Sequence, residues 1–153
     1  AGAIPRLLDL GAEPFLVSSS LNAVVGQRIT RKICPTCKQE YKPEPEILDD
    51  IKKTLGELYP QDNPSPVLYK GTGMEGSEQC KTCKGSEYYG RIGIFEVFPV
   101  TELIAKLTLG RAPLHEIEKQ ATSEGMISMK QDGYLKALEG VTTLEEVLRV
   151  AQD

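Results

Sequence analysis

The chain has 153 residues, which suits one compact domain or one lobe of a larger one. Apolar residues make up 40% of it, and the net charge of −4 argues against a nucleic-acid-binding protein, which usually carries a concentrated basic surface. The sequence contains neither the run of about 18 apolar residues that a membrane span needs nor a signal peptide. We therefore expect a soluble, cytoplasmic chain. Because it does not begin with methionine, we also expect a piece of a longer protein.

The first elements of the chain are predicted to be two helices followed by a strand. Residues 3–10 have apolar side chains at helical spacing and precede Gly11, a typical helix stop. Residues 14–26 begin with Pro14 and carry an apolar stripe, which predicts a second helix. The β-branched residues of 27–33 predict a strand that leads directly into Cys34.

Residues 42–79 differ in composition from the rest, because they contain five prolines and a cluster of acidic residues. Apolar residues at helical spacing between positions 47 and 58 predict one short helix, and residues 67–69 suit a short strand. We interpret this segment as an insertion into the main core.

The remaining elements are predicted to be a strand and four short helices. Residues 90–98 have apolar side chains at both odd and even positions, which suits a strand that is covered on both faces. Beyond Pro99, proline starts, glycine stops and a capping box at Thr143 and Glu146 delimit the helices. Asp132 before Gly133 predicts an irregular turn within the third of them.

Two Cys-x-x-Cys pairs, 42 residues apart, are the strongest chemical signal in the sequence: Cys34, Cys37, Cys80 and Cys83. Two residues between thiols allow one tight turn to direct both sulfurs at one metal ion, and two such turns complete a tetrahedral thiolate site. Thiolates select zinc over magnesium or calcium. Four thiolates leave no open coordination position, so we expect a structural Zn²⁺ site.

Other uses of the cysteines remain open. Disulfides would require an oxidising compartment, and a thioredoxin-like redox pair would need only one motif. A mononuclear iron site or an iron–sulfur cluster uses the same ligands. Lysines flank the pairs and would offset the negative charge of a zinc–tetrathiolate site: Lys32, Lys38, Lys81 and Lys84.

No other residue indicates a catalytic or cofactor-binding site. We expect His115 to be a solvent-exposed helix residue. We expect Glu96 to pair with Arg91 or Arg28, and Arg28 and Arg31 to pair with nearby acids rather than with a phosphate or a partner protein. The sequence contains no Gly-x-x-x-x-Gly-Lys-Ser/Thr loop and no nucleophile–histidine–acid set, so we expect no catalytic residue in this chain.

Several segments, in order, resemble one protein family. They are residues 11–21 (GAEPFLVSSSL), 26–37 (GQRITRKICPTC), 89–97 (YGRIGIFEV), Asp132-Gly133 and 140–150 (GVTTLEEVLRV). Together they resemble the secretion ATPases of the type II secretion and type IV pilus assembly family. The resemblance covers nearly the whole chain except residues 43–76.

The resemblance implies an α/β fold, formed by the end of a RecA-like sheet domain, an inserted tetracysteine zinc subdomain and a C-terminal helical bundle. It implies the end of the ATPase domain at residues 1–33, the zinc-binding subdomain at 34–89, a returning sheet strand at 90–100 and a helical subdomain at 101–153. The four cysteines match the family's zinc ligands. Gln27, Arg28 and Arg31 match its pattern without an assigned nucleotide contact.

The resemblance also implies a hexameric cytoplasmic motor at the inner-membrane face. Its partners would be further copies of itself and the platform proteins of a pilus or secretion machine, without direct nucleic-acid contact. ATP and Mg²⁺ would bind the full-length protein, in parts that precede Ala1. The alternative is a free-standing zinc-ribbon adaptor that binds protein or nucleic acid.

Overall fold

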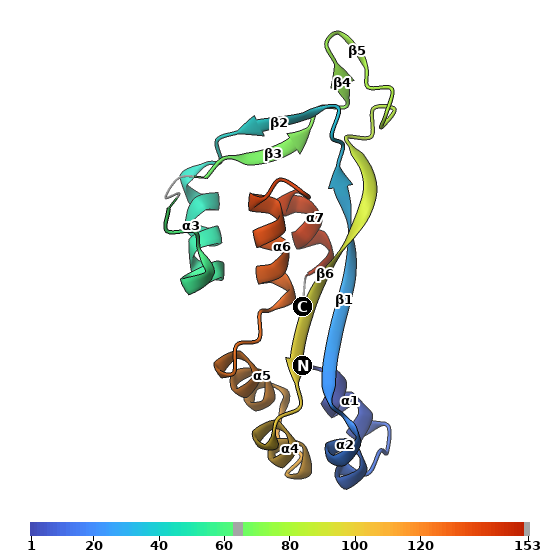
Figure 1. The fold of residues 1–153 in the computed structure, drawn as a ribbon, viewed down its shortest axis with the longest axis vertical. Coiled ribbons are helices and arrows are strands. Elements are labelled where there is room, and N and C mark those ends of the chain that lie inside the picture. The colour runs from blue at the N-terminus through green and yellow to red at the C-terminus, as the bar shows by residue number, and fades with distance from the viewer. Residues whose placement is uncertain (63–65, 152–153) are drawn as a thin grey trace. The chain divides into compact units, whose positions relative to one another are not determined.

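The computed structural model describes residues 1–62 and 66–151, and shows a mixed α/β chain (Figure 1). Residues 63–65, within the predicted zinc-binding segment, and residues 152–153, at the end of the predicted helical segment, lie outside the described part. The helices are α1 (Ala3–Asp9), α2 (Pro14–Ser20), α3 (Pro45–Leu55), α4 (Glu102–Leu109), α5 (Leu114–Ser123), α6 (Met129–Leu138) and α7 (Leu144–Val150), with a 3-10 turn η1 (Gly56–Leu58). The strands are β1 (Ala23–Ile33), β2 (Lys38–Tyr41), β3 (Leu68–Gly71), β4 (Met74–Glu75), β5 (Glu78–Gln79) and β6 (Tyr88–Pro99).

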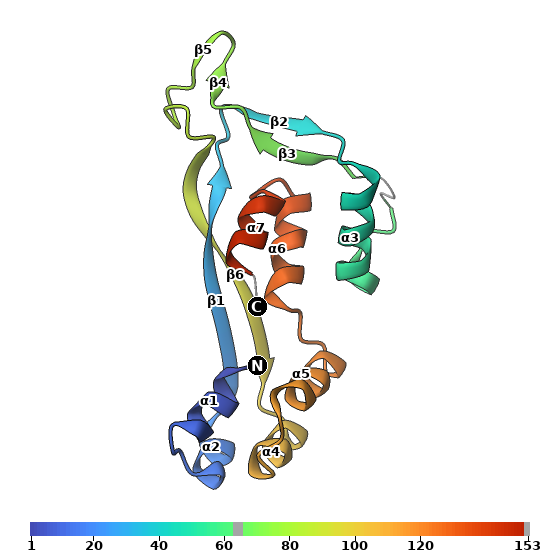
Figure 2. The ribbon, with the colours of Figure 1, turned by 180° about the vertical axis from the view of Figure 1, so that it is seen from behind.

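The strands of the described residues pair two by two. The long strands β1 and β6 pair with each other, and their arrows point in opposite directions (Figures 1 and 2). Strands β2 and β3 form an antiparallel pair in which Lys38 faces Gly71 and Tyr41 faces Leu68. Strands β4 and β5 form a two-residue antiparallel ladder. The segment between β1 and β6 therefore contains both cysteine turns, β2 and the predicted insertion.

The chain divides into two compact units. The first comprises Ala1–Gln27 and Phe95–Ser128, and the second comprises Arg28–Ile94 and Met129–Asp153. The core of the first unit is formed by apolar residues of α1, α2, α4, α5 and the end of β6, with Ile4, Phe98, Ile104 and Ile117 almost fully buried. The Thr101 hydroxyl accepts the backbone N–H of Ile104 and so caps α4.

The second unit has its own core. Ile51 and Leu55 of α3 pack with Leu68 of β3, Ile94 of β6 and the apolar faces of α6 and α7. The predicted helix of the insertion is therefore confirmed as α3, and its apolar stripe is the surface that it buries. The predicted strand at 67–69 is also confirmed, shifted slightly to β3, and the four C-terminal helices are confirmed as α4 to α7.

The predicted helix over residues 14–26 is wrong beyond Ser20. The hydroxyls of Ser18 and Ser19 donate to the carbonyl of Phe15, which competes with the regular helical bonding, and Leu21 is already extended. The β-branched pair Val24 and Val25 then joins β1, where pairing with β6 supplies the backbone hydrogen bonds. The predicted strand at 27–33 thus begins four residues earlier, at Ala23.

One face of β6 is exposed, which corrects the expectation that this strand is covered on both sides. Ile94 and Phe98 are buried, whereas the intervening Phe95 and Val97 are 39% and 50% exposed. In the second unit Tyr89 is exposed in the same way.

The irregular turn predicted at Asp132 is wrong, because α6 continues through it. Gly133 stands there since a Cβ atom at this position would lie 2.4 Å from a methyl group of Val147 on α7. The glycine permits two helices of the second unit to pack closely. Asp132 instead forms an ion pair with Lys136, one turn further along the same helix.

A buried carboxylate ties β1 to α7 within the second unit. The side chain of Glu146 is 2% exposed and accepts the backbone N–H of Arg31 at 3.0 Å. It also binds the guanidinium groups of Arg31, at 2.6 Å, and Arg149, at 2.8 and 2.9 Å. Burial raises the pKa of Glu146, but the hydrogen bonds from Arg149 and Arg31 outweigh it and hold this pKa well below its usual range.

We predict that Glu146→Gln lowers the free energy of unfolding at pH 7 by about 1–3 kcal/mol, because the buried charge-assisted bonds are lost. Because the pKa of Glu146 is lower in the folded than in the unfolded state, its contribution to the free energy of unfolding is fully present above the unfolded-state pKa of about 4.3. The contribution is lost progressively as the pH falls from there toward the folded-state pKa. The difference between wild type and variant should therefore shrink at about pH 3. Urea unfolding at both pH values measures it.

The matched control is Glu145→Gln, because Glu145 is an exposed carboxylate on the same helix. This variant should unfold like the wild type at both pH values. An equal loss of stability in the two variants, or a loss in Glu146→Gln that does not depend on pH, would contradict the assigned role of Glu146.

Candidate metal centre

The four cysteines converge in the second unit. Cys34 and Cys37 lie in the turn between β1 and β2, and Cys80 and Cys83 lie in the turn that follows β5. All four are buried, and they form a cluster separate from the apolar cores. Their Sγ atoms all lie within 4.8 Å of one another.

The spacing of the sulfurs matches that of a tetrahedral zinc site. Sγ of Cys34 lies 3.8 Å from Sγ of Cys80, and Sγ of Cys37 lies 3.7 Å from Sγ of Cys83. A zinc–sulfur bond of about 2.3 Å places the sulfurs of a regular tetrahedron about 3.8 Å apart. The four side chains could therefore hold a metal ion such as zinc.

The same distances bear on the other uses of these cysteines. A disulfide requires sulfurs about 2.05 Å apart, and all four cysteines are free. An iron–sulfur cluster occupies the space between its ligands and would hold the sulfurs further apart. A single iron ion would fit the same tetrahedron as zinc.

The turn around Cys34 favours the thiolate that a metal requires. Burial raises the pKa of Cys34, but hydrogen bonds from the backbone amides of Cys37 and Thr36 and from neighbouring thiols outweigh it and lower the pKa to about 7. Two residues between the cysteines make this possible, because the turn directs the amides that follow Cys34 back at its sulfur.

Backbone hydrogen bonds hold the two turns against their neighbours. The N–H of Cys34 donates to the carbonyl of Glu87 at 2.9 Å, and the N–H of Cys80 donates to the carbonyl of Gly73 at 2.8 Å. The N–H of Thr72 donates to the carbonyl of Cys37 at 3.0 Å. The turn of Cys34 and Cys37 is therefore held by the segments that precede and follow the other turn, and the turn of Cys80 and Cys83 is held by the segment that precedes it.

Two residues contribute to this arrangement without having been predicted. The hydroxyls of Thr36 and Thr82, each in the middle of its Cys-x-x-Cys pair, form a 2.9 Å hydrogen bond. The identical central threonine in both motifs is the signal that could have indicated it. The sequence predicts Glu146 only as part of a capping box, and Arg149 three residues later is the signal that indicates its ion pair.

The charged residues near the motifs have varied surroundings. The ammonium group of Lys38 lies 4.1 Å from the centre of the Tyr69 ring, while Lys32, Lys81 and Lys84 are exposed. The predicted ion pair of Arg31 is confirmed, with Glu146 as its partner.

Of the remaining candidate residues, His115 is exposed, as expected, and so is Arg28. Glu96 contacts the amino group of Ala1, and the ion pairs of the described residues do not include the expected one with Arg91 or Arg28.

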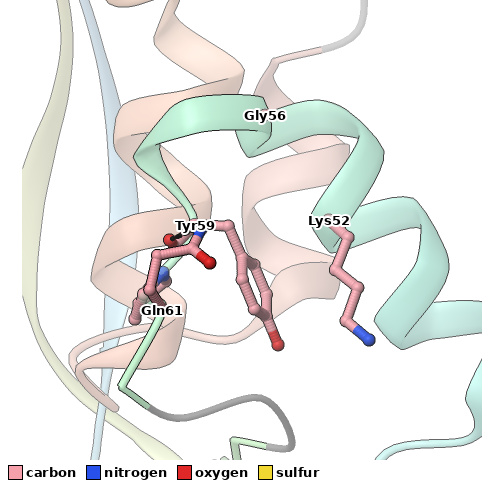
Figure 3. Close-up of a pocket in the computed structure, with 5 residues that line it drawn as sticks. Lys52, Gly56, Tyr59 and Gln61 are labelled. Atoms are coloured by element: carbon pink, nitrogen blue, oxygen red, sulfur yellow. Dashed lines mark hydrogen bonds between the residues drawn. The ribbon is translucent and has the colours of Figure 1, made fainter.

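A hollow of about 340 Å³ in the insertion offers no comparable chemistry (Figure 3). The Tyr59 ring lies between the side chains of Gln61 and Lys52, and the Lys52 ammonium is 5.8 Å from the ring centre. The amide of Gln61 donates to the carbonyl of Tyr59 itself. Tyr59 is 8% exposed and belongs to the apolar core with Ile51 and Leu55, so its role here is structural.

We predict that Gly71→Ala destabilises the region around the cysteines. A Cβ atom at Gly71 would lie 2.2 Å from the carbonyl oxygen of Glu87, a backbone atom that accepts the N–H of Cys34. Overpacking of this kind costs about 1–3 kcal/mol. Chemical unfolding should show the loss, and a thiol reagent should label Cys34 faster than in the wild type.

Gly2→Ala is the control, since a Cβ atom there meets nothing within 4 Å and the backbone is already helical. It should leave both measurements unchanged. Wild-type stability and labelling in Gly71→Ala would show that the approach of β3 to Glu87 does not support the cysteine turns.

No helix among residues 1–62 and 66–151 combines the length and apolar character that crossing a bilayer requires.

Comparison with known proteins identifies relatives along nearly the whole chain. Residues 1–149 match the family model described as "Type II/IV secretion system protein". The type IV pilus assembly ATPase PilB of Thermus thermophilus is 39% identical over 97% of this chain, and the type II secretion system protein E of Pseudomonas aeruginosa is 38% identical over 99%. The type IV pilus assembly ATPase PilB of Myxococcus xanthus is 35% identical over 96%.

The chain spans only 15%, 28% and 24% of the length of these three relatives, respectively. The match includes both Cys-x-x-Cys pairs and the paired strands around them, so it covers the whole candidate metal centre. By its sequence, this chain belongs to the type II/IV secretion system protein family.

Proposed function

We propose that this chain is the C-terminal part of a hexameric cytoplasmic ATPase that powers type IV pilus assembly or type II secretion, and that Cys34, Cys37, Cys80 and Cys83 bind one structural zinc ion in it. The observation that carries the proposal is a buried tetracysteine cluster with tetrahedral spacing in a chain of this family. Relatives in the family are named pilus assembly ATPases and type II secretion proteins.

In this proposal, residues 1–33 are the end of a RecA-like domain, 34–89 the zinc subdomain, 90–100 a returning strand and 101–153 a helical subdomain. The exposed apolar residues of the long strands support it, because in each unit taken separately they are surfaces for further chain to cover. In the first unit these are Val25, Phe95 and Val97, and in the second Ile29 and Tyr89.

The zinc ion would serve structure rather than chemistry. Four thiolates fill its coordination shell, so no position is left to polarise water or a phosphate. Its role would be to close the insertion on itself and to keep β1 and β6 in register. ATP and Mg²⁺ would be bound by the preceding part of the protein, where a phosphate-binding loop is required.

The partners in this proposal are further copies of the protein, as a hexamer, and the platform proteins of the pilus or secretion machine at the inner-membrane face. Direct contact with nucleic acid plays no part in it, which is consistent with the net charge of −4.

We predict one zinc ion per chain in protein purified under reducing conditions without added metal. Elemental analysis of folded protein measures the stoichiometry, because zinc bound by four thiolates survives gel filtration. A zinc content near zero in reduced, folded protein would contradict the proposed site. One iron ion per chain would show that the same four ligands bind a different metal.

We predict that Cys80→Ser releases zinc and increases amide hydrogen exchange across residues 34–85, while α4 and α5 change little. These two helices belong to the other compact unit and bury their own apolar residues. Ser77→Ala is the matched control, because Ser77 is exposed in the β4–β5 hairpin that precedes Cys80 and offers no thiolate. A uniform loss of protection along the chain would contradict a local role for the metal.

We predict that these 153 residues alone hydrolyse no ATP, whereas the full-length protein does. In the full-length protein, Cys34→Ser should lower the amount of hexamer more than the turnover of each hexamer that forms. Turnover measured alongside size-exclusion chromatography separates the two effects. Magnesium-dependent turnover by the isolated chain would overturn the placement of the catalytic parts.

A further inference from the structure

A pocket of about 240 Å³ lies in the second unit, between the end of β2, α3, α6 and α7. Its base is apolar, because Tyr134 is fully buried and Leu144 is 8% exposed. Ile47 is half-buried on its side, and Leu148 is 40% exposed. Apolar side chains that form a cavity and remain accessible are typical of a binding site rather than of a packed core.

Carboxylates are the charged groups among the residues that line this pocket: Glu46, Asp50 and Glu145. Asp50 is already engaged, since it accepts the hydroxyl of Tyr134 at 2.5 Å and lies 3.9 Å from the ammonium of Lys130. Glu46 and Glu145 are exposed and form no hydrogen bond or ion pair within the described part of the chain. The pocket therefore offers two carboxylates beside an apolar interior, one in the first turn of α3 and one in the first turn of α7.

Two tyrosine rings complete the lining. Tyr41 is half-buried, and its pKa is raised, first by burial and then by the negative charge of Glu145. The ammonium groups of Lys70 and Lys130 lie 5.5 and 5.1 Å from the ring centres of Tyr41 and Tyr134, but neither lysine lines the pocket. Each ring therefore already makes a cation–π contact with a lysine outside the pocket.

The size and charge of the pocket restrict its occupant. A drug-sized ligand usually occupies about 300–1,000 Å³, so this cavity suits a single side chain of a partner protein. An occupant must bring an apolar stem for Leu144 and Ile47 and a positive head for Glu46 and Glu145. A guanidinium group matches two carboxylates and also stacks on aromatic rings, which an ammonium group does less well.

We propose that this pocket is a docking site for an arginine side chain of a partner protein, with the aliphatic stem against Leu144 and Ile47 and the guanidinium between Glu46 and Glu145. The site does not depend on the identity of the metal or on the proposed ATPase function. Helices α3 and α7 each contribute three of its lining residues, so an occupant would contact both the insertion and the last helix of the second unit. Arginine is a common anchor in protein interfaces, where it fills such pockets.

The test uses the 153-residue chain and three small probes in solution, followed by the chemical shifts of its amides in NMR. The probes are the N-acetyl methylamides of arginine, of lysine and of citrulline, the neutral isostere of arginine. The arginine probe should cause saturable shifts at Tyr41, Ile47 and Leu148, with an affinity of roughly millimolar. The lysine probe should bind less tightly, and the citrulline probe should cause no saturable shift.

Variants then test whether the two carboxylates bind the guanidinium group. Glu46→Gln and Glu145→Gln should each weaken binding of the arginine probe by about fivefold, the effect of one partly exposed ion pair. Glu118→Gln is the control, because Glu118 is an exposed carboxylate on α5, outside the pocket. It should leave the affinity unchanged. The amide spectra of all three variants should overlay on the wild type away from the substituted residue.

The proposal is overturned by saturable shifts that map outside the pocket, by equal binding of citrulline, or by equal binding of lysine. An equal loss of affinity in Glu118→Gln would also overturn it, because the effect would then arise from net charge alone. Wild-type affinity in both pocket variants would show that the carboxylates do not recognise the guanidinium.

Discussion

The convergence of four sulfur atoms is the constraint on which the second unit depends. The turns that carry them are separated by 42 residues, and closing such a segment costs conformational entropy that its short strands do little to recover. Once the Sγ atoms of Cys34 and Cys80 lie 3.8 Å apart, the β2–β3 and β4–β5 pairs form between fixed ends. The backbone bond from Cys34 to Glu87 then places the start of β6 beside the end of β1.

A buried ion pair joins the end of β1 to the last helix of the second unit. Glu146 is buried beneath Arg31, and the hydroxyl of Thr142 donates to the carbonyl of the same arginine. The Arg31 guanidinium also lies 4.1 Å from the centre of the Tyr88 ring, at the start of β6. Buried charge of this kind stabilises only when it is fully paired, which makes the start of α7 sensitive to any change at Arg31. The same helix also contributes Leu144, Glu145 and Leu148 to the pocket near Tyr41.

The sequence by itself determined the features that depend on local chemistry. Two residues between cysteines make one metal-binding turn, and a threonine three residues before a free backbone N–H makes a helix cap, as at Thr101 and Thr143. Helical periodicity identified α3 and the four C-terminal helices, because an amphipathic stripe depends only on near neighbours in the chain. The family could also be recognised, since its motifs are short contiguous segments.

Tertiary structure decided what depends on a distant partner. Val24 and Val25 fit a helical stripe as well as a strand, and only pairing with β6, about seventy residues later, made them part of β1. The apolar alternation of β6 could not show which face this chain covers, because Phe95 and Ile94 are equally apolar in sequence yet only Ile94 meets the core. Glu146 looked like a cap residue until Arg31 was brought to it across 115 positions. In each case the deciding energy comes from a contact between residues far apart in the chain, which local sequence patterns do not record.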